Sequence, residues 1–253
     1  MTNTSKRTFA FFVTPHGFGH AARSAAVMHF LSQLSPGAQF EIFTHVPAWF
    51  FENSLEAPVS PVVHFHDVLT DIGLVQTTSM EANLDETIRQ LDLLMPFRED
   101  LVKSLARQVR DAGCEMVVCD IAALGIAVAK EAGLPSILEE NFTWDWIYQG
   151  YLDVEPRFSP FVSYLRDLYQ TVDYHIRTEP GSTDLPPADL EVGVVSREPR
   201  HSRSAIRKRL GVPEDLPMVM ITMGGIVTQY PFLERLENVK DIRFLIPGGI
   251  SAS

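Results

Sequence analysis

The chain has 253 residues, 45% of them hydrophobic, and a formal net charge of −11 at pH 7. This length and composition are enough to bury a core in one large domain or in two smaller ones. The negative charge argues against nucleic acid and anionic membranes as partners, because both present negative surfaces. Near the N-terminus, the apolar run Phe9–Val13 is too short for a signal peptide or a membrane span. We therefore expect a cytoplasmic protein without a membrane segment.

The two cysteines, Cys114 and Cys119, flank a single predicted strand. An extended strand separates their Cα atoms by roughly 16 Å, which is too far for a disulfide bond. Buried free thiols in a reducing compartment are the expected state.

Short β-rich runs alternate with longer helical patterns along residues 1–178. The predicted strands are Phe9–Val13, Phe40–Phe43, Val62–Phe65, Met116–Cys119, Ser136–Leu138 and Tyr174–Arg177. The predicted helices are Ala21–Leu34, Asp85–Ala112, Ala122–Ala132 and Phe161–Thr171. Strands that alternate with helices are typical of a parallel sheet with helices on both faces. We predict an α/β, Rossmann-like first domain over residues 1–178.

Turn residues then dominate residues 179–211, which we predict to be a linker ending in the helix Ser202–Leu210. A second Rossmann-like unit is expected over residues 212–253, with strands at Met218–Thr222 and Ile242–Ile246 and a helix at Gln229–Asn238. An independent domain of this kind usually takes about 100 residues. The second unit is therefore expected to be incomplete, either as part of a longer domain or as a tail that packs on the first one.

A glycine turn lies in the run Thr14–Arg23, where an apolar strand leads through Gly17 and Gly19 directly into a helix. Free backbone amides at a helix start, and glycines that let a ligand come close, form an anion site. The spacing lacks the third glycine of a dinucleotide fingerprint and the lysine of a P-loop. From spacing alone, a packing turn without a ligand fits equally well.

Three segments carry a more specific resemblance: Thr14–Arg23, the loop Glu140–Tyr148 with its two tryptophans and an aspartate, and Arg207–Gly211. Together they resemble the glycosyltransferase-like N-terminal region of L-arabinokinases and its stand-alone bacterial relatives. The resemblance runs through most of the chain in order. It implies a GT-B fold, with an acceptor-side N-terminal domain and a donor-side C-terminal domain. The kinase half of arabinokinases has no counterpart in this sequence, so kinase activity is not expected.

The resemblance implies an inverting, metal-independent glycosyltransferase that moves a sugar from a nucleotide-sugar donor to a hydroxyl acceptor. Such a transfer needs a base for the acceptor proton, and histidine, with an ordinary pKa of about 6.5, suits this work at neutral pH. His20 resembles the base that follows the first glycine turn in related enzymes. Asp120 ends the predicted strand Met116–Cys119, where such sheets place ligands, and the resemblance makes it the candidate that orients His20. No cofactor is expected besides the nucleotide sugar as co-substrate.

Binding roles fall on the two glycine turns and on the tryptophan loop. The expected substrate-binding residues are His16, Gly17, Phe18, Gly19, Asn141, Trp144 and Asp145. The donor phosphate is expected on Gly224 and Gly225, which follow the first strand of the second unit. No metal site is expected, because His16 lies in the turn rather than on the helix of His20, and no glutamate accompanies the two histidines.

Each role has a structural alternative. His20 can be an ordinary helix-start residue, and Asp120 can be the N-cap of the helix beginning at Ala122. Trp144 and Trp146 can anchor their loop in the core instead of stacking on a sugar. The whole chain can be a sugar or nucleotide-sugar binding module without turnover, and a GT-B epimerase is a third alternative.

Overall fold

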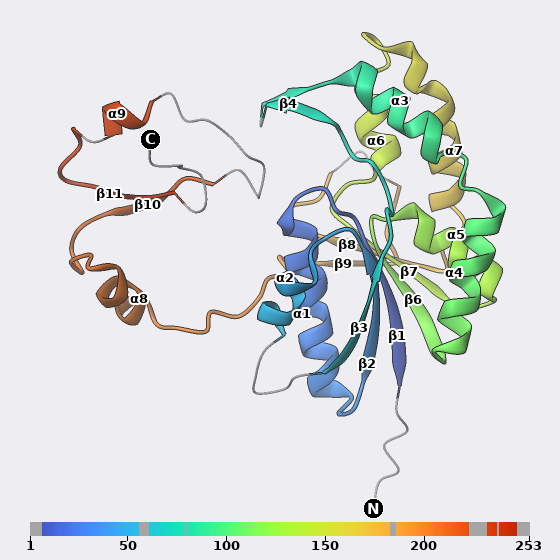
Figure 1. Cartoon of the computed structure of the whole chain (residues 1–253), viewed down its shortest axis with the longest axis horizontal. Coiled ribbons are helices and arrows are strands. Elements are labelled where there is room, and N and C mark those ends of the chain that lie inside the picture. The colour runs from blue at the N-terminus through green and yellow to red at the C-terminus, as the bar shows by residue number, and fades with distance from the viewer. Residues whose placement is uncertain are drawn as a thin grey trace, which may run out of the picture. The chain divides into compact units, whose positions relative to one another are not determined.

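The computed structural model describes residues 7–55, 61–78, 80–182, 186–222, 232–236 and 238–246 (Figure 1). The chain divides into two compact units, one made of residues 1–75 and 83–197 and the other of residues 76–82 and 198–253. Gly224 and Gly225, the predicted phosphate-binding pair, lie outside the described residues. In the described part of the chain, no helix is both long and apolar enough to cross a bilayer.

A seven-stranded sheet forms the centre of the first unit, and all its strands are parallel. In spatial order the strands are β3 (Val62–Asp67), β2 (Gln39–Thr44), β1 (Thr8–Val13), β6 (Cys114–Asp120), β7 (Ser136–Glu140), β8 (Tyr174–Thr178) and β9 (Leu190–Val192). The strand order reverses between β1 and β6. In open α/β sheets, ligands bind at the carboxyl ends of the strands beside such a reversal.

Helices cover both faces of the sheet (Figure 1), which confirms the predicted α/β class. The helices α1 (Phe18–Leu34) and α2 (Ala48–Ser54) pack over one buried cluster that includes Phe11, Phe40 and Phe51. The other face is covered by α3 (Leu84–Leu94), α4 (Glu99–Asp111), α5 (Ala123–Ala132), α6 (Trp144–Gln149) and α7 (Ser159–Tyr169). Cys114 and Cys119 are both buried and free.

The predicted helix Asp85–Ala112 is wrong in its continuity, because the structure divides it into α3 and α4. Pro96 lies between them. A proline has no amide hydrogen for the helix ladder and clashes with the preceding turn, so a helix does not continue through it. The strand β9 was also not predicted, and it adds to the sheet beside β8.

The second unit contains short elements. The helix α8 (Arg203–Leu210) is capped by Ser202, whose side chain accepts from the amide of Ala205, and it ends at Gly211 in a left-handed conformation. The strands β10 (Met218–Met220) and β11 (Arg243–Leu245) pair in parallel. The remaining elements are α9 (Leu233–Leu236) and the hairpin β4 (Gln76–Thr78) with β5 (Glu81–Ala82).

Candidate functional site

The structure brings His20 and Asp120 together at the carboxyl end of the sheet. His20 lies in the first turn of α1, which begins directly after Gly17. Gly17 has a φ of 80°, a value that only glycine adopts easily. Asp120 is the last residue of β6 and is fully buried. Nδ1 of His20 lies 2.8 Å from Oδ1 of Asp120, across 100 residues of sequence. A carboxylate at Nδ1 favours the tautomer with its proton there, which leaves Nε2 free to accept one.

Arg23 and Ser24, one turn further along α1, complete the surroundings of Asp120. Arg23 donates from Nε to Oδ2 at 3.0 Å and from Nη2 to Oδ1, and Ser24 donates its hydroxyl to Oδ2 at 3.0 Å. Burial would raise the pKa of Asp120, but the charges and hydrogen bonds of Arg23 and His20 outweigh it and lower that pKa below its ordinary value. Asp120 is therefore a carboxylate at neutral pH.

The same guanidinium of Arg23 reaches three further side chains on β7, β8 and the loop between them. Nη1 donates to Asn141 at 2.9 Å and to Thr178 at 3.1 Å, and Nε lies 3.6 Å from Oε1 of Glu139. Glu139 is 4% exposed. Burial, followed by the charge of Asp120, raises its pKa to about 8. The sequence analysis missed both Arg23 and Glu139 as parts of the site.

The alternative in which Asp120 caps the next helix is wrong. The helix α5 begins at Ala123, and its N-cap, Ala122, makes no side-chain capping hydrogen bond. Ile121 separates Asp120 from this cap with a left-handed φ of 46°. The side chain of Asp120 accordingly bonds to α1 instead of α5.

His16 and Trp144 are in contact beside the glycine turn. Their rings meet edge to face with centroids 5.1 Å apart. Burial, and then the charge of His20, lowers the pKa of His16, so His16 is neutral at pH 7. Trp144 is only 2% exposed, and its Nε1 has no hydrogen-bond partner among the described residues. This burial favours the core alternative for Trp144, and its stacking on a sugar stays a prediction.

The other predicted binding residues are distributed around the same edge. Phe18 stacks on Phe50 with ring centroids 4.9 Å apart, and Gly19 is exposed. Asn141 is held by Arg23. Asp145 is 9% exposed and accepts a 3.4 Å hydrogen bond from Arg166. The structure thus gives Asn141 and Asp145 protein partners.

Asp71, in the loop after β3, is a second buried carboxyl at this edge that the sequence analysis missed. It is 1% exposed, and Oδ1 accepts a 2.7 Å hydrogen bond from the hydroxyl of Thr14. Burial raises its pKa to about 7, although the hydrogen bond from Thr14 opposes the shift. The preference of ligand sites for the ends of strands could have pointed to Asp71, because its loop follows the predicted strand Val62–Phe65.

Comparison with solved structures identifies the architecture. CalG4, the calicheamicin glycosyltransferase, matches 98% of this chain with 68% of its own, at a TM-score of 0.59 and 13% identity. Medicago truncatula UGT71G1, complexed with UDP-glucose, matches 99% with 73% of its own, at a TM-score of 0.56 and 12% identity. The chain has the GT-B glycosyltransferase fold. Within this fold, Asp120 is the last residue of β6 and His20 lies in the first turn of α1.

Sequence comparison supports the predicted resemblance. No family model matches the chain. L-arabinokinase of Arabidopsis thaliana is 28% identical over 221 residues, which are 86% of this chain. The chain spans 21% of the length of that relative.

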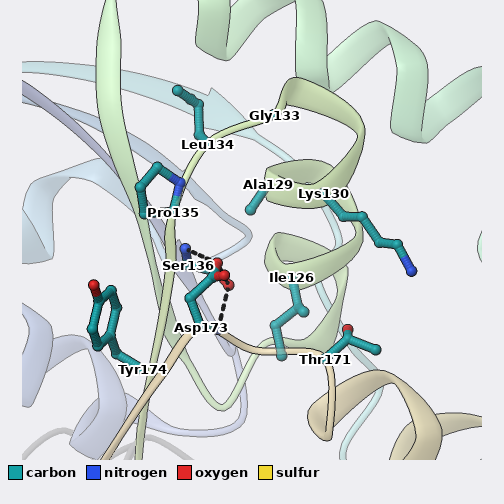
Figure 2. A pocket seen from close by; sticks show the side chains of 10 residues that line it. All are labelled: Ile126, Ala129, Lys130, Gly133, Leu134, Pro135, Ser136, Thr171, Asp173 and Tyr174. Atoms are coloured by element: carbon teal, nitrogen blue, oxygen red, sulfur yellow. Dashed lines mark hydrogen bonds between the residues drawn. The ribbon is translucent and has the colours of Figure 1, made fainter.

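A cavity of about 590 Å³ lies at the opposite ends of the strands (Figure 2). It opens beside Ser136 and Tyr174, the first residues of β7 and β8. Asp173 in its wall accepts hydrogen bonds of 2.8 Å from the amide and the hydroxyl of Ser136. This cavity is separate from the His20 site, because parallel strands place their first residues at the far edge of the sheet.

Proposed function

We propose that this chain belongs to a nucleotide-sugar glycosyltransferase that inverts the anomeric centre and needs no metal. The observation that carries the proposal is the 2.8 Å contact between His20 and Asp120 at the strand ends of a GT-B fold. A neighbour with this fold is complexed with UDP-glucose, which supports a nucleotide sugar as the donor.

In the proposed reaction, His20 is the general base. Nε2 accepts the proton of the acceptor hydroxyl while that oxygen forms a bond to the anomeric carbon. The bond from this carbon to the nucleoside diphosphate breaks, and the diphosphate leaves with the electron pair. Asp120 accepts the hydrogen bond from Nδ1 and stabilises the imidazolium that forms. Since this pair supplies the base, the proton transfer does not require a metal-bound oxygen.

Of the binding roles expected from the sequence, this proposal keeps those at the two glycine turns and at Asn141. The acceptor hydroxyl would lie at the turn of Gly17 and Gly19, next to His20. The donor phosphates would lie on Gly224 and Gly225. Asn141 would bind the substrate through its side-chain amide. The hydrogen bond from Arg23 fixes the orientation of this amide.

A binding module without turnover is the second candidate. The ion pair of Arg23 with Asp120 supports it, because a neighbouring cation offsets the carboxylate charge that would stabilise a protonated His20. The two candidates differ in turnover but not in binding.

The test measures binding of UDP-glucose by calorimetry, and release of UDP in the presence of a panel of hydroxyl acceptors. For the full-length protein we expect acceptor-dependent UDP release and a product of inverted anomeric configuration by NMR. Binding without release would favour the module. A product with retained configuration would contradict His20 as the base of a single displacement.

A further inference from the structure

Ile121, the residue after Asp120, has a backbone conformation that its side chain disfavours. Its φ of 46° lies in the left-handed region, and it is the only non-glycine residue with positive φ in the described part of the chain. A β-branched side chain makes this region especially unfavourable. Ile121 is also fully buried, so solvent does not stabilise its polar backbone groups. The surrounding structure must therefore hold this conformation.

Two hydrogen bonds hold the backbone of Ile121. Its amide donates to the carbonyl of Glu139 on β7 at 3.2 Å. Its carbonyl accepts from the hydroxyl of Tyr169 at 2.6 Å. Tyr169 is the last residue of α7 and is 7% exposed, so its hydroxyl reaches the site from an element 48 residues away.

The conformation of Ile121 decides where the chain runs after Asp120. The carbonyl of Asp120 still accepts from the amide of Thr14 at 3.3 Å, as part of the sheet. Immediately afterwards the chain turns at Ile121 toward α5. The carboxylate of Asp120 stays on the side of α1, where it meets His20, instead of turning to the start of α5.

We propose that Tyr169 is a positioning residue for the pair of His20 and Asp120. This inference rests on the proposed function. The hydroxyl of Tyr169 holds Ile121 in its left-handed conformation, which fixes the direction of the Asp120 carboxylate and, through it, the ring of His20. Tyr169 bonds to the backbone next to Asp120 and does not contact His20 by any described interaction.

The first test compares Tyr169→Phe with Tyr164→Phe. Both tyrosines lie on α7, and the hydroxyl of Tyr164 also bonds to a backbone group, the amide of Phe97 at 3.1 Å. NMR of the His20 ring nitrogens reports the hydrogen bond from Nδ1 to Asp120 without any substrate. We expect Tyr169→Phe to weaken this signal and to lower kcat for UDP release from UDP-glucose on the order of tenfold. Tyr164→Phe should change neither, even if it lowers Tm by a similar amount.

A rescue separates positioning from general loss of stability. Glycine adopts the left-handed region without assistance, so Ile121→Gly in the Tyr169→Phe background should restore the His20 signal and kcat, although the lost side chain lowers Tm. Ile121→Leu, which keeps the volume but removes the β-branch, is the second rescue variant and should restore part of both. A Tyr169→Phe protein with wild-type signal and kcat would overturn the proposal. So would a loss that neither rescue variant reverses.

The same measurements distinguish this inference from the proposed function. If His20→Ala keeps wild-type turnover, the proposed function fails, while the NMR comparison still shows whether Tyr169 positions Asp120. If His20→Ala loses turnover and Tyr169→Phe does not, only the positioning role fails.

Discussion

Asp120 and Glu139 lie directly opposite each other on the neighbouring strands β6 and β7, and both are buried. Burial and the charge of Asp120 raise the pKa of Glu139 to about 8, so at neutral pH Asp120 is charged and Glu139 is protonated. Arg23 contacts Asp120 and lies 3.6 Å from Glu139. The site is thus built around one buried guanidinium, and this arrangement leads to the first prediction.

Arg23→Met should destabilise the protein by about 3–5 kcal/mol, because it leaves Asp120 buried without its cation. The free energy of unfolding in urea measures this. The control is Arg89→Met, which removes an exposed, solvent-screened pair with Glu86 and should change the free energy of unfolding far less. Equal effects of the two substitutions would mean that Arg23 does not stabilise the buried carboxylate of Asp120.

Asp71→Asn should stabilise the protein at alkaline pH. The pKa of Asp71 is raised from 3.8 to about 7 in the folded state, so between these values the folded chain keeps a proton that the unfolded chain has released. Stability therefore falls as the pH rises from about 4 to 7, by about 4 kcal/mol in total. Asparagine keeps an oxygen that accepts the hydrogen bond from Thr14, and because it does not titrate, it removes this pH-dependent loss of stability.

The gain in unfolding free energy from Asp71→Asn should accordingly grow between about pH 4 and pH 7 and then level off. Urea titrations at each pH measure it, and the exposed Asp153→Asn serves as the control. A gain that does not depend on pH would contradict the buried, proton-holding state of Asp71.

Gly73→Ala should damage the packing around His16. Gly73 has a φ of 63°, and an added Cβ would lie 2.6 Å from Nδ1 of His16 and 3.0 Å from Cη2 of Trp144. Gly37→Ala is a matched control, because Gly37 also has positive φ, at 92°, with nothing within 4 Å of the added atom. The control measures the backbone cost alone, about 1 kcal/mol.

We expect Gly73→Ala to lower stability by about 1–3 kcal/mol more than Gly37→Ala, and to change the fluorescence of Trp144. Equal losses of stability in the two alanine variants, with no change in fluorescence, would contradict the close approach of Gly73 to His16.

Asp120→Asn should lower turnover by roughly 10²–10⁴-fold, because the amide no longer stabilises a protonated His20. The structure adds a second consequence. Arg23 loses its carboxylate partner as well, so Tm should fall along with the activity. Steady-state kinetics together with a melting curve test both parts. Wild-type turnover in Asp120→Asn would remove Asp120 from the mechanism.

The alternation of strands and helices predicted the parallel sheet. The meeting of His20 with Asp120 was predicted from the position of Asp120 at a strand end together with the family resemblance. The sequence did not predict Arg23, because one arginine within an apolar helix pattern gives no sign of the carboxylates it meets across the sheet. The left-handed conformation of Ile121 could not be predicted from the sequence either. An isoleucine carries no turn signal, and its conformation depends on the distant hydroxyl of Tyr169.

In the proposed reaction, His20 takes the proton of the acceptor hydroxyl. The most direct test compares kcat/KM for UDP-glucose between His20→Ala and His29→Ala, with UDP release as the readout. His29 lies on the same helix, and its ring bonds to the exposed Gln33. We predict a loss of roughly 10²–10⁴-fold for His20→Ala with little change in Tm, and no loss for His29→Ala. Wild-type turnover in His20→Ala would contradict the role of His20 as the base.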